Sequence, residues 1–277
     1  MYWTPSSRSR RRIALAGLLA WLSAAAQPAL AMVDFQWDVN PWPGPSGTVL
    51  SHTYTGIGNG DITVTITGNT GALVTDPGSA GGAPLSPESN FFLDPTGNNG
   101  ENSFFIRANG NFVAPYINFT FDFDELLGGR TAITDLSFSI FDIDANPATS
   151  WMDWVRIRGV LEDGSLVAPT SITGLGAASW IYSENAAGTA GRVRGTSPNQ
   201  PSTGPGSDNG TANVFFDQDI TEFQIRYRNL QNNGTNQWIA ISNLLFADIP
   251  EPGTFSMLGL GLVGLTVVGR RRENRAA

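Results

Sequence analysis

The sequence contains no cysteine and no lysine, and it has a single histidine, His52. Without cysteine the chain forms no disulfide and supports no thiol-based catalysis. A zinc enzyme would have only one imidazole ligand available, whereas zinc sites usually contain several histidine or cysteine ligands. Stability must therefore come from buried apolar surface, or from a metal held by oxygen ligands.

Positive charge is scarce in the middle of the chain. All 16 basic residues are arginine, and eight of them lie outside residues 32–249, in the two terminal segments. The central region holds eight arginines against 22 acidic residues, a formal charge of −14. Such a surface argues against binding DNA, RNA or anionic lipid through bulk charge, and it suits an exported protein that can hold divalent cations.

Long apolar runs occur only at the two ends. At the N-terminus, Arg8 and Arg10–Arg12 precede the apolar run 13–22, and Ala29-Leu30-Ala31 supplies the small-x-small pattern that signal peptidase cuts. We therefore expect residues 1–31 to be a signal peptide and the mature protein to begin near Met32. General secretion and twin-arginine export both remain open.

The C-terminal segment 250–277 combines three features. Pro250, Glu251 and Pro252 form a short motif, an uncharged stretch runs from Gly253 to Gly269, and Arg270, Arg271 and Arg272 follow directly. As a helix, the uncharged stretch with Pro252 reaches about 27 Å, enough to cross a bilayer core. The three arginines would then hold the far end in the cytoplasm.

This tail resembles the C-terminal signal of the PEP-CTERM family of bacterial exported proteins. The resemblance rests on Pro250-Glu251-Pro252, the glycine-rich apolar segment and the arginine cluster. It implies recognition by an exosortase, transient anchoring in the inner membrane, and a final place on the surface or in the extracellular matrix of a Gram-negative bacterium. A permanent single-span anchor is the alternative.

Residues 32–249 read as strands throughout, and their length suits one domain with its own core. Apolar and polar residues alternate in 61–67, 116–124 and 221–228, which predicts antiparallel sheets with one buried face. We expect an all-β, two-sheet antiparallel β-sandwich, most simply a jelly roll. The only helical turn expected here is 124–127. Further strands are expected at 48–54, 104–107, 134–143, 154–160, 165–172 and 237–246, and the interior should contain Phe119, Phe121, Phe123, Phe223, Ile225 and Tyr227.

Four oxygen-bearing side chains have the spacing of a calcium-binding loop. With Asp142 as position one, Asp144 is three, Asn146 is five and Asp153 is twelve. Pro147 stands where an EF-hand needs glycine, and the flanks read as strands; both features count against a true EF-hand. Two interpretations stay open: a calcium loop within the sandwich, or acids that are solvated at a strand end or paired with arginine.

Six of the eight central arginines occur in pairs two residues apart: Arg156 and Arg158, Arg192 and Arg194, Arg226 and Arg228. On strands, each pair would share one face. Forked guanidinium groups can grip the uronate or sulfate groups of an acidic polysaccharide. Tryptophan could stack on the sugar rings, and the candidates are Trp151, Trp154, Trp180 and Trp238. The alternative is cross-strand pairing of these arginines with acids.

Two functions from different classes follow from these patterns. The favoured one is a non-catalytic exported surface or matrix protein that associates with exopolysaccharide, with Ca²⁺ as a potential ligand and no nucleic-acid partner. The alternative is a secreted polysaccharide-cleaving glycoside hydrolase or lyase. Its two-carboxylate site would come from Asp122, Asp124 and Glu125, or from Asp142 and Asp144.

The calcium loop makes a direct prediction for stability. If Ca²⁺ binds only the folded state, then at a hundred times its dissociation constant it stabilises residues 32–249 by about 2.7 kcal/mol. Thermal melts with Ca²⁺ and with chelator should differ accordingly, and Asp144→Ala should abolish the difference. Identical melts at millimolar Ca²⁺ would remove the calcium hypothesis.

Overall fold

The computed structural model describes residues 32–43, 49–58, 60–73, 85–86, 103–108, 116–125, 132–143, 145–146, 151–174, 180–184, 187–196, 210–230 and 237–248. All of them belong to one compact unit, Met32–Ala277. The expected signal peptide and the sorting tail with its membrane segment lie outside the described residues. Within those residues, no helix has both the length and the apolar character needed to cross a membrane.

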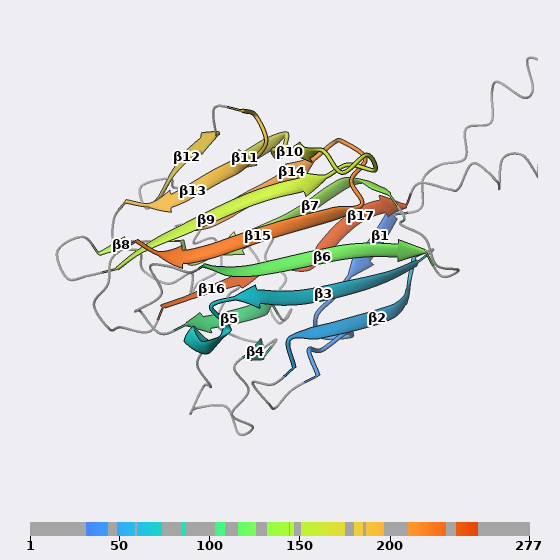
Figure 1. Ribbon diagram of the computed structural model, residues 1–277, viewed down its shortest axis with the longest axis horizontal. Coiled ribbons are helices and arrows are strands. Elements are labelled where there is room, and N and C mark those ends of the chain that lie inside the picture. The colour runs from blue at the N-terminus through green and yellow to red at the C-terminus, as the bar shows by residue number, and fades with distance from the viewer. Residues whose placement is uncertain are drawn as a thin grey trace, which may run out of the picture. The chain divides into compact units, whose positions relative to one another are not determined.

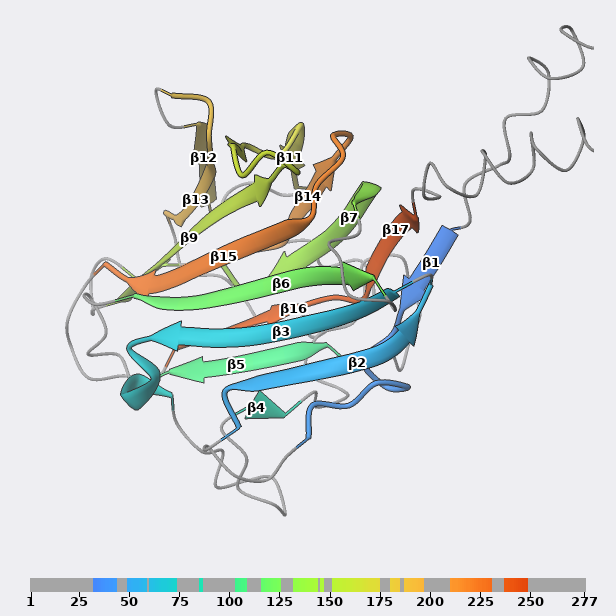
Figure 2. The same ribbon diagram turned by 45° about the vertical axis from the view of Figure 1, so that its right-hand side comes forward.

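The described residues form two sheets in which every strand pairing is antiparallel (Figures 1 and 2). The nine-stranded sheet has the order β12 (Trp180–Glu184), β13 (Gly191–Gly195), β9 (Trp151–Val160), β15 (Glu222–Asn229), β6 (Ile117–Glu125), β3 (Gly60–Gly68) and β2 (Ser51–Ile57), with β10 (Leu166–Val167) and β8 (Ala145–Asn146) also on β9.

The eight-stranded sheet has the order β1 (Met32–Phe35), β17 (Leu244–Asp248), β7 (Ile133–Phe141), β16 (Gln237–Ile241), β5 (Phe104–Ala108) and β4 (Leu85–Ser86). In addition, β14 (Ala212–Phe216) pairs with β7, and β11 (Ser171–Thr173) pairs with β14. The described residues contain one short 3-10 helix, η1 (Thr70–Ala72).

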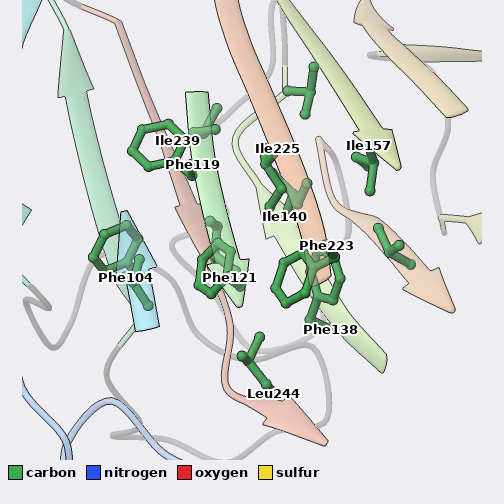
Figure 3. Close-up of a cluster of buried hydrophobic side chains, with 14 of the residues drawn as sticks. Phe104, Phe119, Phe121, Phe138, Ile140, Ile157, Phe223, Ile225, Ile239 and Leu244 are labelled. Carbon is green, nitrogen blue, oxygen red and sulfur yellow. The ribbon is translucent and has the colours of Figure 1, made fainter. Parts of the chain in front are cut away.

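Alternation along the strands creates the core. In β15, Phe223, Ile225 and Tyr227 have no exposed surface, while the residues between them are partly exposed. The six residues expected in the interior are all at most 2% exposed, so this prediction is confirmed. Figure 3 shows Phe119, Phe121 and Phe223 of the nine-stranded sheet beside Phe104, Phe138 and Ile140 of the other.

Aromatic rings join the two sheets directly. The ring centroids of Phe138 and Phe223 lie 5.0 Å apart, and those of Phe123 and Phe246 lie 5.4 Å apart in an edge-to-face arrangement. Each of these pairs takes one ring from either sheet, and such contacts add about 0.5–1.5 kcal/mol beyond area burial. Two antiparallel sheets with a shared core are thus confirmed, whereas the jelly-roll connection remains a prediction.

Two expected strands are each broken into two. The expected strand 165–172 is divided between β10 in one sheet and β11 in the other, because Pro169 has no N–H for a ladder and the chain crosses between sheets there. The expected strand 237–246 breaks between β16 and β17 at Ser242 and Asn243. Their oxygens accept hydrogen bonds from the backbone N–H groups of Ser139 and Trp37, at 2.8 and 3.1 Å.

The expected helical turn at 124–127 is wrong for its first two residues. Asp124 and Glu125 belong to β6, where they pair with Asp61 and Gly60 of β3. The backbone ladder therefore continues through residues that the turn would have used, and residues 126–127 lie outside the described part.

The core leaves no room for a side chain at Gly159, near the end of β9. A Cβ there would lie 2.8 Å from Cγ2 of Ile220 and 3.0 Å from Cγ2 of Val167. Gly159→Ala should therefore lower the free energy of unfolding by about 1–3 kcal/mol through overpacking. Denaturant unfolding measures this change. Gly71→Ala is the matched control, because the nearest atom to a Cβ there is 4.0 Å away; equal effects of both changes would contradict the packing argument.

Candidate functional site

The outer side of the nine-stranded sheet gathers all six paired arginines on three adjacent strands. Arg192 and Arg194 come from β13, Arg156 and Arg158 from β9, and Arg226 and Arg228 from β15. Their strand neighbours, such as Val155, Val193 and Ile225, are buried in the core, so the arginines point outward. We call these six residues the arginine face; the prediction that each pair shares a face is confirmed.

The strand register places like charges directly opposite one another. Arg156 is the cross-strand partner of both Arg192 and Arg226. Burial lowers the pKa of the Arg156 guanidinium, and the charges of Arg158, Arg226 and Arg192 lower it further. Burial also lowers the pKa of Arg158, with a second contribution from Arg226 and an opposing one from Glu222. Crowded like charges destabilise a bare sheet and favour the binding of an anion.

Three arginines of the arginine face donate hydrogen bonds to neutral acceptors. Arg158 Nε donates to Gln224 Oε1 at 2.6 Å, and Arg226 Nε donates to Asn118 Oδ1 at 2.8 Å. Arg228 Nη1 donates to the Tyr116 hydroxyl oxygen at 3.2 Å. These contacts orient three of the guanidinium groups, and the charge of Glu222 acts on one of them, Arg158. Pairing of the other arginines with acids stays open.

Three of the arginines also carry a buried Nε atom that has no hydrogen-bond partner in the described part of the chain. They are Arg156, Arg192 and Arg228. A buried donor without an acceptor costs roughly 1–3 kcal/mol, and more when it is charged. The Nε–H groups of these three arginines therefore lack a hydrogen-bond acceptor, and the oxygens of a bound oxyanion would supply one.

Two aromatic rings hold Arg228 in place. Its Cζ atom lies 4.3 Å from the centroid of the Trp154 ring and 4.9 Å from that of Tyr116. The Cζ atom of Arg226 lies 4.7 Å from the same Tyr116 ring. Cation–π contacts of this kind contribute about 0.5–1 kcal/mol at exposed sites. One side of Trp154 therefore stacks on an arginine, and the side chain of Trp151 lies outside the described residues, as do those of Trp180 and Trp238.

A small hollow lies in the arginine face. It is lined by Asn118, Arg156, Arg158, Gln224, Ile225 and Arg226, and its volume is about 10 Å³. That is about the space one water molecule needs. The hollow can take an oxygen of a carboxylate or sulfate group, whereas a sugar ring must stay above it. Because three guanidinium groups and two side-chain amides surround it, the hollow offers only N–H donors and amide oxygens.

The calcium candidates are arranged differently from solvated acids. Asp142 has a positive φ of 63° and is 8% exposed; Asp153 is 1% exposed and accepts a 2.7 Å hydrogen bond from the Tyr227 hydroxyl. Asn146 lies in β8, and Asp144 lies outside the described residues. The described residues contain no group of three or more acidic or histidine side chains that could hold a metal ion. Asp142 and Asp153 are buried, so the interpretation that these two acids are solvated at a strand end is wrong. Calcium binding by this loop stays a prediction.

The residues considered for catalysis are dispersed or only partly described. Asp122 is half-buried on the outer side of β6, where its cross-strand partners are Glu222 and Thr63, and the side chains of Asp124 and Glu125 lie outside the described residues. His52 packs edge-on against Tyr54, with ring centroids 4.5 Å apart, and burial lowers its pKa. These surroundings favour a packing role for His52.

Three members of the site were missed in the sequence. Tyr116, Asn118 and Gln224 hold the arginines. Asn118 and Gln224 lie on β6 and β15, and Tyr116 directly precedes β6; all three fall within segments whose alternation was recognised. The signal available in the sequence was that all three residues occupy outward positions in the alternation. Their partners could not be read because the order of strands in the sheet was unknown.

The fold and the site together define a two-sheet antiparallel β protein with a basic outer face. A family model described as the PEP-CTERM protein-sorting motif matches residues 248–272, so the chain carries this motif at its C-terminal end. The motif supports an exported protein that is processed by an exosortase. It begins at Asp248, the last residue of β17.

Other comparisons add nothing about the fold or the site. No curated protein matches the chain. A structure of infectious bursal disease virus Gx strain aligns with 86% of this chain and 68% of its own chain, at 13% identity and a TM-score of 0.14. A TM-score this low carries no argument.

The crowded arginines predict that the protein's stability depends on anions. Sulfate should raise the melting temperature of the unmodified protein, because it binds the folded state; at ten times its dissociation constant the gain is about 1.4 kcal/mol. Arg156→Gln removes the central charge and should lose most of the gain. Melts in sulfate and in chloride at equal ionic strength measure this. Arg107→Gln, in β5 of the other sheet, is the charge-matched control; the same loss in both variants would show a general salt effect.

Proposed function

We propose that the protein is a non-catalytic component of the cell surface or extracellular matrix of a Gram-negative bacterium, and that its arginine face binds acidic exopolysaccharide. The observation that carries this proposal is the set of six outward arginines on β13, β9 and β15, three of which donate hydrogen bonds to neutral partners. A domain with a formal charge of −14 concentrates six of its eight arginines on one face of one sheet. Such an arrangement suits recognition of spaced carboxylate or sulfate groups.

The positions of the chain ends support the proposed sorting route. Met32 of β1 pairs with Ala247 of β17, so the two segments that carry the export signals leave the sheet as cross-strand neighbours. β17 is also paired with β7 on its other side, and the motif begins where this strand ends. Removal of the tail beyond Pro252 would leave both ladders of β17 intact. The inner membrane would then hold the protein only transiently, through residues 253–269.

The arginine face extends along the strands from Arg158, near the finish of β9, to Arg228, near the finish of β15. Figure 1 shows the start of β1 and the end of β17 on the right, where β9 and β6 also finish, whereas β15 finishes on the left. The aromatic-held Arg228 lies near the finish of β15, and the acidic Glu222 lies at its start. Calcium binding at the loop 142–153 is a separate part of the proposal.

Binding of the exported protein to polygalacturonate, with dextran as the neutral comparison, tests the proposal. We expect binding to polygalacturonate that weakens with added salt, and no binding to dextran. The double variant Arg156→Gln/Arg226→Gln should bind at least tenfold more weakly, because charge-assisted hydrogen bonds contribute about 1.5–3 kcal/mol each.

Arg107→Gln, which lies in the other sheet, should bind like the unmodified protein. Equal binding by the double variant would reject the arginine face as the site. New reducing ends or unsaturated sugars during incubation would instead support the hydrolase or lyase alternative.

A further inference from the structure

The arginine face continues, on the same side of the sheet, into a surface of hydroxyl groups. On β3 the residues Thr63 and Thr65 alternate with the buried Ile62, Val64 and Ile66, so their side chains point outward as the arginines do. Strand register connects the two surfaces. One line of cross-strand partners runs from Arg158 through Gln224, Thr120 and Thr65 to Ser51, across β9, β15, β6, β3 and β2.

The hydroxyl groups at the β2 end of this line are held in fixed pairs. Ser51 Oγ lies 3.0 Å from Thr65 Oγ1, and Thr53 Oγ1 lies 2.9 Å from Thr63 Oγ1. A hydroxyl has one donor and two acceptor sites, and each pair consumes one donor and one acceptor. Each pair therefore keeps one O–H donor and several acceptor sites, which match the mixed donor and acceptor character of neutral sugar hydroxyls.

Along this line of cross-strand partners, from β9 towards β2, the charge of the outward side chains changes from positive to negative. The six arginines end at β15, and the neighbouring strands β6 and β3 carry outward Asp122 and Asp61 among neutral side chains. A polymer with an acidic group on every sugar would place further negative charges beside these carboxylates. A polymer whose acidic sugars alternate with neutral ones would place its charge on the arginine face and its neutral hydroxyls on Thr63 and Thr65.

We propose that the outer side of the nine-stranded sheet binds a glycan of alternating acidic and neutral sugars lying across the strands, with an acidic group at the Arg156, Arg158 and Arg226 hollow and neutral sugars on the hydroxyl pairs of β3 and β2. At about 4.8 Å between strands, the line from β9 to β2 spans about 19 Å, which is room for several sugars. This inference rests on the proposed function and adds the ligand's charge pattern and direction.

The test compares two polyanions on the exported protein. Hyaluronate alternates glucuronate with a neutral sugar, whereas polygalacturonate carries a carboxylate on every sugar. Dissociation constants per sugar at one salt concentration should favour hyaluronate. The double variant Thr63→Val/Thr65→Val, nearly isosteric, should weaken hyaluronate binding about tenfold while leaving sulfate-linked stabilisation unchanged, because the hollow is intact.

Two controls accompany the variant. Thr65→Ser keeps the hydroxyl and should bind like the unmodified protein. If the double variant fails to fold, the comparison of hyaluronate with polygalacturonate on the unmodified protein still decides the test. Thr173→Val, in β11 of the other sheet, removes a hydroxyl elsewhere and should change nothing.

The outcomes separate this inference from the proposed function. If Arg156→Gln weakens binding of both polyanions and the threonine variants weaken neither, the arginine site stands and the alternating pattern is wrong. Tighter binding of polygalacturonate than of hyaluronate by the unmodified protein would also show that the alternating pattern is wrong. If Arg156→Gln changes neither affinity, the proposed function itself fails.

Discussion

The side-chain alternation of paired antiparallel strands is the constraint on which the rest of this structure depends. Phe223, Ile225 and Tyr227 of β15 fill the space between the sheets, so Arg226 and Arg228 must face outward. A slip of one residue would exchange the two sets and bury arginines without partners. Ring contacts such as Phe138 with Phe223 connect the sheets and hold that register. The apolar core thus fixes the positions of the charges on the opposite side.

In the arginine face, repulsion between like charges costs stability, while hydrogen bonds hold the side chains in fixed positions. Arg156 has an arginine opposite it on both sides, and burial together with these neighbours lowers its pKa. Asn118 and Tyr116 orient Arg226 and Arg228 without cancelling their charge. A cluster that is held rigidly and left charged gains most from an incoming oxyanion, because little conformational freedom is lost when the anion binds.

Long strands with clear alternation were predictable from the sequence, whereas the breaks and several short strands were not. β3, β6 and β15 were recognised to within one residue, because alternation over eight or nine residues is specific. β14, with five residues, was missed. The break at Ser242 depends on a hydrogen bond from Ser139, about a hundred residues away in the chain. No local pattern contains that partner.

The sequence by itself determined the sorting motif and, for the strands expected at 154–160 and 221–228, that the two arginines of each strand share one face. A C-terminal signal is a linear segment, so its residues can be recognised in order, and alternation within one strand needs no knowledge of its neighbours. Only the tertiary structure decided that β13, β9 and β15 are adjacent, that Arg192, Arg156 and Arg226 share one line, and that Asn118 and Tyr116 join them. Strand order comes from backbone pairing between distant segments, and the core that selects this pairing is assembled from all of them at once.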